Sequence, residues 1–188
     1  MLSGLRGLLP LYVRNFLIGL SAKESAKILY PPIIKRYTVK GKVVSINISD
    51  KKGVRKKPVK EALIKTDFGI EGDAHASSKW HRQVSLLAME SIKKMQTMGL
   101  KVNPGDFTEN ITTEGIDLLK LPIGTGMKIG KNVEAEISQV GKECHTRCSI
   151  YYQAGDCIMP TEGIFVKVIK GGKVKEGDVI KITVLGKE

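Results

Sequence analysis

The three cysteines of this 188-residue chain all lie within residues 141–165, at Cys144, Cys148 and Cys157. One of the three histidines, His145, lies there too. Cysteine sulfur can pair in a disulfide, ligate a soft metal, or act as a nucleophile that carries another sulfur atom. Their gathering in one short segment predicts a functional site, and the sequence must indicate which of these chemistries applies.

The spacing of these residues argues against structural zinc. The segment contains C-H-x-x-C and no C-x-x-C, and adjacent Cys144 and His145 are poorly placed to ligate one tetrahedral ion. Cys157 precedes two apolar residues and is consistent with a buried, unreactive thiol. Cys148 follows Arg147, and a cationic neighbour favours the thiolate. Cys148 is therefore the favoured reactive sulfur, and a Cys144–Cys148 disulfide under oxidation stays open.

Two further segments could contribute polar groups to the same site. Residues 69–85 contain a glycine-rich turn, His75, and Arg82, whose guanidinium can bind a carboxylate or a phosphate. Residues 105–115 contain Asn110, which can donate and accept at the edge of a heterocycle. Both segments could equally be ordinary polar loops, and the spacing of the histidines does not indicate a metal motif.

Alternating apolar residues predict the elements that position these segments. A period of two predicts half-buried strands. A helix is expected from residues 83–87 to about Met98, where Gly99 ends it, with Ile92 and Met95 on its apolar face. Many short strands, one clear helix and frequent glycine turns predict a mostly β, barrel-like and mostly antiparallel fold. The expected strands contain Val44, Ile46 and Ile48; Ala62, Ile64 and Thr66; residues 127–129; Val133, Ala135 and Ile137; residues 164–169; and residues 179–184.

The composition favours an anionic partner. The chain carries 31 Lys and Arg against 19 Asp and Glu, a net charge of +12. Nucleic acid, an acidic protein, a membrane surface or a phosphorylated small molecule could match this charge. The densest basic cluster, residues 51–57, is expected to be a solvated loop first, a phosphate contact second and a nucleic-acid contact third. With no convincing signal peptide, reduced thiols and a cytoplasmic location are expected.

The N-terminal stretch is expected to be a helical extension. Residues 5–20 are apolar but interrupted by Arg6, Pro10, Arg14 and Asn15. They are too short for a membrane span of about 20 apolar residues. An amphipathic helix docked on the body or on a second subunit is favoured over a membrane-surface anchor.

Three motifs follow one another along the body: GIEGDAHASSKWHRQVSLL, GDFTENITTEGIDLLKLPIGT and GKECHTRCSIYYQAGDCIMPTEGIF. With them the chain resembles the MOSC family, domains related to the C-terminal part of molybdenum cofactor sulfurase. The similarity covers about residues 40–184 and is closest to the small stand-alone branch. It implies a MOSC-type β-barrel with one or a few short helices over residues 40–188, preceded by a probably helical extension at 1–39.

The resemblance also implies a function and a site. The family is thought to bind the molybdopterin form of the molybdenum cofactor and to carry sulfur through a cysteine. Cys148 is the matching residue and would ligate molybdenum if the cofactor binds; Cys144 is the second candidate. By motif position, the residues expected to bind the pterin and its phosphate are Gly72, Asp73, His75, Arg82, Gln83 and Asn110.

The resemblance leaves alternatives open. Some members of the family are molybdenum-dependent reductases of N-hydroxylated compounds, and a non-catalytic cofactor-binding module is a third reading. No pyridoxal phosphate is expected in this chain alone. A sulfur carrier would therefore need a cysteine desulfurase or another sulfur donor, with molybdenum cofactor biosynthesis proteins or molybdoenzymes as further partners. No nucleic acid is expected, and the sequence predicts no oligomeric state.

Overall fold

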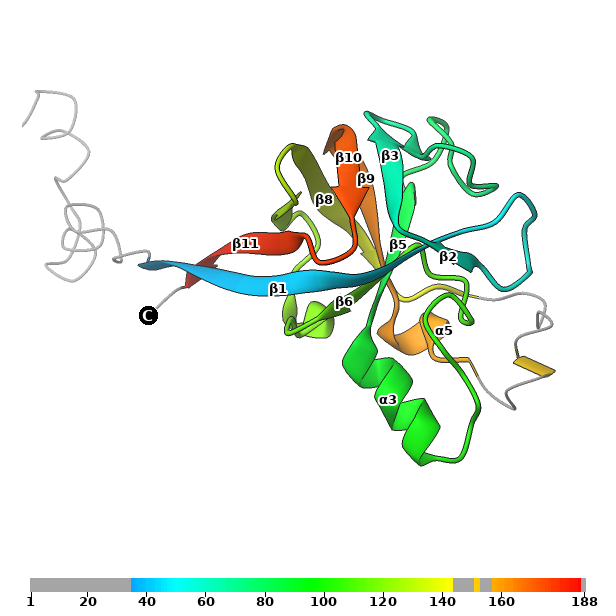
Figure 1. Cartoon of the computed structure of the whole chain (residues 1–188). Helices are drawn as coiled ribbons and strands as arrows, with labels where there is room; N and C mark the ends of the chain where they lie inside the picture. The colour runs from blue at the N-terminus through cyan, green and yellow to red at the C-terminus, as the bar shows by residue number, and fades with distance from the viewer. Residues whose placement is uncertain (1–34, 144–150, 153–156, 187–188) are drawn as a thin grey trace, which may run out of the picture. The chain divides into compact units, whose positions relative to one another are not determined.

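The computed structural model describes residues 35–143, 151–152 and 157–186, and Tyr37–Val184 form one compact unit (Figure 1). The helical segments with described bounds are α3 (Met89–Thr97), the 3-10 turn η2 (Leu118–Lys120) and α5 (Met159–Glu162). Its strands are β1 (Lys35–Ile48), β2 (Lys57–Val59), β3 (Glu61–Lys65), β4 (Gly69–Ile70), β5 (Val84–Ala88), β6 (Ile111–Glu114), β7 (Gly126–Ile129), β8 (Val133–Val140), β9 (Ile164–Lys170), β10 (Gly172–Lys175) and β11 (Val179–Gly186).

The strands form a closed barrel. The main sheet has the order β11-β7-β8-β9-β5-β6-β1-β2, and an additional pairing between β11 and β1 closes seven of these strands into a ring. A smaller sheet has the order β10-β3-β4. The neighbours β5 and β6 run parallel, whereas the other pairs with a described register are antiparallel. The predicted β-barrel fold is confirmed.

The barrel interior is almost entirely aliphatic, and alternation along the strands builds it. In β8, Val133, Ala135 and Ile137 are buried, while Glu134 and Glu136 between them are not. Each fully buried valine or isoleucine contributes roughly 1.5–3 kcal/mol relative to an exposed one. The predicted strands at 127–129, 133–137, 164–169 and 179–184 are all present.

The strand β1 departs from simple alternation. The sequence places Val44, Ile46 and Ile48 on one face, but a bulge between Val43 and Ser45 shifts the register against β6. Val43 therefore enters the core in place of Val44. Because a bulge adds a residue to one strand, it changes the face of every residue on one side of it.

The expectation that the helix begins within residues 83–87 is wrong. Residues Val84–Ala88 form β5, a fully buried strand between β9 and β6. The helix α3 follows immediately and has no side-chain cap. Its later half matches the prediction, since Ile92 and Met95 are buried and Gly99, with φ of +92°, ends it. A strand buried on both faces has no alternation that separates it from a following helix.

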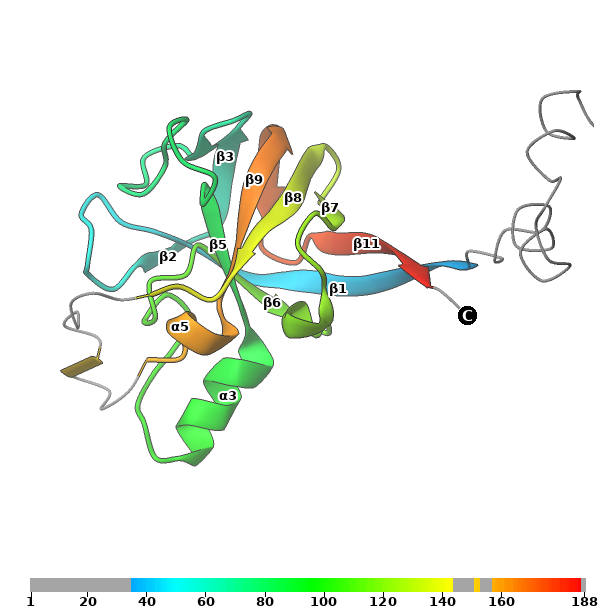
Figure 2. The ribbon, with the colours of Figure 1, turned by 180° about the vertical axis from the view of Figure 1, so that it is seen from behind.

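Figures 1 and 2 show α3 and α5 side by side beneath β5 and β6, outside the barrel. A second apolar cluster joins these elements: Leu87, Ile92, Met95, Val102, Phe107, Ile158, Met159 and Phe165. This cluster anchors the loop before β6 and the α5 turn, which both contribute to the site below. In the described part of the chain, no helix has the length and apolar character needed to cross a membrane.

Candidate functional site

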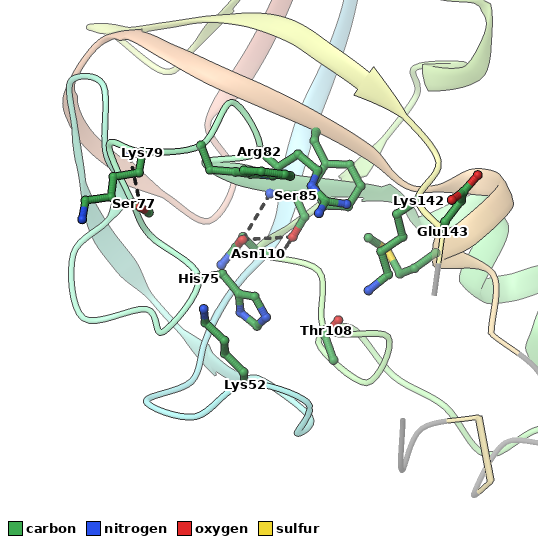
Figure 3. Close-up of a pocket in the computed structure, with 13 residues that line it drawn as sticks. Lys52, His75, Ser77, Lys79, Arg82, Ser85, Thr108, Asn110, Lys142 and Glu143 are labelled. Carbon is green, nitrogen blue, oxygen red and sulfur yellow. Dashed lines mark hydrogen bonds between the residues drawn. The ribbon is translucent and has the colours of Figure 1, made fainter. Parts of the chain in front are cut away.

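A cavity of about 500 Å³ opens where several loops converge on β5 (Figure 3). The loop β1–β2, the loop β4–β5, the loop before β6, the end of β8 and the helix α5 all contribute to it. Its walls come from segments up to about a hundred residues apart in sequence. The lining residues are Lys52, His75, Ser77, Lys79, Trp80, Arg82, Ser85, Thr108, Asn110, Lys142, Glu143, Met159 and Phe165.

The charged lining of this cavity is strongly cationic. Four basic side chains, Lys52, Lys79, Arg82 and Lys142, face a single carboxylate, Glu143. None of the four forms an ion pair with another described residue. A concave site with an excess of unpaired positive charge attracts anions and concentrates them. We call these four side chains the cavity cations.

Arg82 is held by aromatic rings rather than by a carboxylate. Its guanidinium carbon lies 5.0 Å from the centre of the Trp80 ring and 5.3 Å from that of Phe165. Contacts of this kind are cation–π interactions, which orient the guanidinium without neutralising it. Arg82 lies two residues before β5, and Phe165 lies in the paired strand β9. No described residue forms a hydrogen bond or an ion pair with Arg82, so its hydrogen-bonding edge is available to an acceptor in the cavity.

Asn110 lies at the base of the cavity and ties β5 to the loop before β6. Its side-chain oxygen accepts hydrogen bonds from the backbone N–H of Ser85 at 3.1 Å and from the Ser85 hydroxyl at 2.9 Å. Its Nδ2 donates to the backbone oxygen of Asn47 at 3.3 Å. One amide hydrogen remains for a ligand. Asn110 thus lines the predicted site, but most of its side-chain hydrogen bonds are with Ser85 and Asn47 of the surrounding strands.

Asp73 does not line the cavity but lies behind it. Its side chain is buried and forms an ion pair with the equally buried Lys56, while the backbone N–H groups of Ser49 and His75 donate to its oxygens at 3.1 and 3.0 Å. Burial alone would raise the pKa of Asp73, but the contacts with His75 and Lys56 outweigh it and hold that pKa well below its usual range. Asp73 is therefore a charged anchor for the loop that carries His75.

Gln83 and Gly72 were also predicted to bind the cofactor, but neither lines the cavity. Gln83 is buried, donates to Asp67 at 3.0 Å, and accepts the backbone N–H of Val168 at 2.9 Å. Gly72 has a φ of +80° in the turn before Asp73, and a side chain there would meet no neighbour, so the backbone conformation alone explains this glycine. Of the six predicted binding residues, His75, Arg82 and Asn110 line the cavity.

Two buried ionisable groups were not foreseen from the sequence. Lys56 belongs to the basic cluster expected to be a solvated loop, yet only 4% of it is exposed. Glu109 is fully buried; its Oε1 accepts from the Gly105 N–H at 2.5 Å and from the Thr112 hydroxyl at 2.8 Å, whereas its Oε2 has no partner among the described residues. Burial raises the pKa of Glu109 to about 7.

The predicted reactive sulfurs, Cys144 and Cys148, lie outside the described residues, as does His145. Cys144 is nevertheless the next residue in the sequence after Glu143, which lines the cavity. Cys157 is half-buried and packs against the second apolar cluster. Among the described residues, no group of three histidine, cysteine, aspartate or glutamate side chains could hold a metal ion.

The comparison with protein families shows to which family the barrel domain belongs. The model of the MOSC domain matches residues 71–181, more than half of the chain and the part that contains every lining residue except Lys52. The chain belongs to the MOSC domain family. This family is associated with binding of the molybdenum cofactor. A search of curated proteins found no match for this MOSC protein.

Solved structures agree on the fold. The YuaD protein from Bacillus subtilis is 19% identical, with a TM-score of 0.65 over 80% of this chain and 98% of that one. YiiM from Geobacillus stearothermophilus is 19% identical, with a TM-score of 0.57 over 78% of this chain and 75% of that one. YiiM from Escherichia coli is 20% identical, with a TM-score of 0.52 over 79% and 70%. At this identity the likeness concerns the fold alone.

Proposed function

We propose that this MOSC protein binds the molybdenum cofactor in its molybdopterin form and acts as a sulfur carrier or sulfurtransferase in cofactor maturation. Cys148 is the proposed sulfur-carrying residue and molybdenum ligand, with Cys144 as the second candidate. The observation that carries the proposal is the cationic cavity, whose rim residue Glu143 immediately precedes Cys144 in the sequence. We further propose a cytoplasmic location.

The described residues fit such a group. Molybdopterin combines a phosphate ester with a flat heterocycle, and the cavity combines unpaired cations with an aromatic and apolar wall made by Trp80, Phe165 and Met159. A volume of about 500 Å³ is within the range of small-molecule sites. The cofactor would supply the molybdenum and the dithiolene sulfurs at which the reaction takes place.

The cavity cations and Asn110 are proposed to contact different parts of the cofactor. Arg82, with its free hydrogen-bonding edge, is the bidentate phosphate donor, and Lys52, Lys79 and Lys142 add charge from three other directions. The remaining Nδ2 hydrogen of Asn110 is available to an acceptor on the heterocycle. Lys142, two residues before Cys144, also favours a thiolate nearby in the chain.

The proposed sulfur chemistry needs partners. A cysteine desulfurase or another donor would supply the sulfur. The recipients would be proteins of molybdenum cofactor biosynthesis or molybdoenzymes. The cationic face of the cavity would favour delivery of an anionic cofactor.

Mass spectrometry of the intact protein tests the sulfur-carrier role. After incubation with a cysteine desulfurase and free cysteine, without reductant, we expect the mass of one added sulfur atom on Cys148. Cys148→Ser should lose the addition and Cys157→Ser should keep it. A wild-type protein with no added sulfur on either Cys148 or Cys144 would contradict the sulfur-carrier role. If the added mass lies on Cys144, the role stands and the residue assignment changes.

A further inference from the structure

Thr108 lines the cavity in a backbone conformation that is unfavourable for its side chain. Among the described residues other than glycine, only Asp67 and Thr108 have a positive φ, of +48° and +69°. Aspartate visits this left-handed region fairly readily, whereas a β-branched residue there is a true outlier, because its side chain crowds the backbone. Asp67 does not line the cavity. The strained threonine therefore lies at the candidate site.

The neighbours of Thr108 on both sides hold it in this conformation. Phe107 is buried in the second apolar cluster. Glu109 is fully buried, and its Oε1 accepts hydrogen bonds from the Gly105 N–H at 2.5 Å and from the Thr112 hydroxyl at 2.8 Å. The backbone N–H of Thr108 itself donates to the Gly105 oxygen at 3.1 Å. Because these interior contacts fix the chain before and after Thr108, the fold can sustain the strain between them.

The Thr108 hydroxyl faces the cavity without a partner among the described residues. Its side chain is half-buried, and Figure 3 shows its oxygen directed into the cavity. The other hydroxyls of the lining are engaged. That of Ser77 accepts the backbone N–H of Lys79 at 3.2 Å. That of Ser85 donates to Asn110 at 2.9 Å. Since a threonine hydroxyl can donate one hydrogen bond and β-branching restricts its rotation, Thr108 offers a donor of fixed direction.

We propose that Thr108 is a binding residue of the cavity: its hydroxyl donates a hydrogen bond to an oxyanion attracted by the cavity cations, and its strained backbone directs the hydroxyl there. The lysines among the cavity cations carry flexible point charges, whereas the Thr108 hydroxyl makes binding depend on where an acceptor oxygen lies. The inference rests on the proposed function in that the phosphate of the cofactor is the expected occupant. It follows that removing this side chain should stabilise the fold and weaken the site.

Thr108→Gly tests both parts, because it removes the strain and the hydroxyl together. Glycine adopts a positive φ without steric cost, although it loses more freedom on folding. We expect the unfolding constant, measured with denaturant, to fall roughly two- to fivefold. The affinity for sulfate, measured by calorimetry on the full-length protein at fixed pH and ionic strength, should fall roughly tenfold, as for a lost hydrogen bond to a charged acceptor. A purely structural threonine would leave this affinity unchanged.

Two further variants separate the strain from the hydroxyl. Thr108→Val keeps the branched shape and the strain but has no donor, so sulfate should bind as weakly as in Thr108→Gly, without the gain in stability. Thr108→Ser keeps the hydroxyl and should retain most of the affinity. The control is Thr97→Val: the Thr97 hydroxyl donates to the backbone oxygen of Lys94 at 2.7 Å within α3, and the residue does not line the cavity. This variant should bind sulfate like the wild type.

Three results would overturn the inference: wild-type sulfate affinity in Thr108→Val, an equal loss of affinity in Thr97→Val, or a wild type that does not bind sulfate. A Thr108→Gly variant less stable than the wild type would contradict the strain. The inference and the proposed function can fail separately. Weakened sulfate binding in Thr108→Val of a protein that acquires neither molybdenum nor pterin would refute the function alone. Pterin in the wild type with unaltered sulfate binding in Thr108→Val would refute the inference alone.

Discussion

The buried pair of Lys56 and Asp73 and the cavity cations differ in whether their charges are paired within the protein. The buried pair of Lys56 and Asp73 is neutralised internally, and backbone N–H groups complete the hydrogen bonding of the carboxylate. The cavity cations form no ion pair with a described residue, and Glu143 is the one carboxylate among the residues that line the cavity with them. Charge that is satisfied within the protein serves the fold, whereas charge left unpaired in a concave site is available to a ligand. Substitutions in the two clusters should therefore affect different properties.

The largest effect on stability is expected for the buried pair. Lys56→Met leaves the Asp73 carboxylate buried without its partner, and removing one member of such a pair costs roughly 3–5 kcal/mol. The matched control is Lys52→Met in the same loop, at an exposed lysine, where we expect a change within about 0.5 kcal/mol. Denaturant unfolding measures both. Equal losses would mean that the two clusters do not differ as described.

The buried Glu109 predicts a stability that depends on pH. Its pKa is raised to about 7 by burial, so the folded state holds the proton more tightly than the unfolded state. The resulting stability is fully present below the unfolded pKa of about 4.5 and is lost as the pH rises through about 7. A shift of this size corresponds to the order of 3 kcal/mol.

Glu109→Gln should remove most of this pH dependence, because a neutral amide mimics the protonated acid. We expect the variant to be more stable than the wild type at about pH 8 and similar to it near pH 5. Denaturant unfolding at several pH values checks this. Glu162→Gln is a suitable control, since the pKa of Glu162 is lowered by its contacts with Lys94 and Ser91 although burial acts the other way. A wild-type stability that rises from pH 5 to pH 8 and keeps rising in Glu109→Gln would contradict the assignment.

The cavity cations should show the opposite pattern, with a small effect on folding and a large one on binding. Arg82→Gln removes the guanidinium between the two aromatic rings and should cost about 0.5–1 kcal/mol of stability. It should lower the affinity for sulfate at least tenfold, since a charged hydrogen bond is worth about 1.5–3 kcal/mol. Arg55→Gln is the control, because Arg55 pairs with Asp106 at 3.4 Å and does not line the cavity. An unchanged sulfate affinity in Arg82→Gln would show that this side chain does not contribute to anion binding.

The smallest effect is expected at a pair that belongs to neither cluster. Lys173 and Glu61 form an exposed ion pair of 2.8 Å between β10 and β3. Exposed pairs contribute about 0–1 kcal/mol. Lys173→Met should therefore change stability by less than about 0.5 kcal/mol, and it should leave sulfate binding unaltered. A loss as large as that of Lys56→Met would show that burial is not what separates the pairs.

The sequence alone led to the barrel because most strands are half-buried, so apolar and polar residues alternate along them. It failed at β5, where all five residues are buried and no turn residue separates the strand from α3. It also failed at β1, because a bulge is a property of the pairing with β6.

For the site, local sequence indicated His75, Arg82 and Asn110 but not their surroundings. The rings of Trp80 and Phe165 around Arg82 come from positions 85 residues apart, and the partner of Asp73 lies 17 residues earlier in a basic cluster. Nothing in a run of lysines and arginines marks the one that the fold buries. A side chain at position 105 would clash with the backbone oxygen of Lys56, but this contact is known only once the chain is folded.

The proposed function requires that the cavity binds the phosphorylated pterin of the molybdenum cofactor. The most direct measurement is the molybdenum and pterin content of the protein purified from a cofactor-producing host, by elemental analysis and fluorescence. We expect stoichiometric pterin in the wild type and in Arg55→Gln, and a strong reduction in Arg82→Gln. A wild-type protein without pterin, or an Arg82→Gln variant that retains all of it, would mean that the cavity is not the binding site of the cofactor.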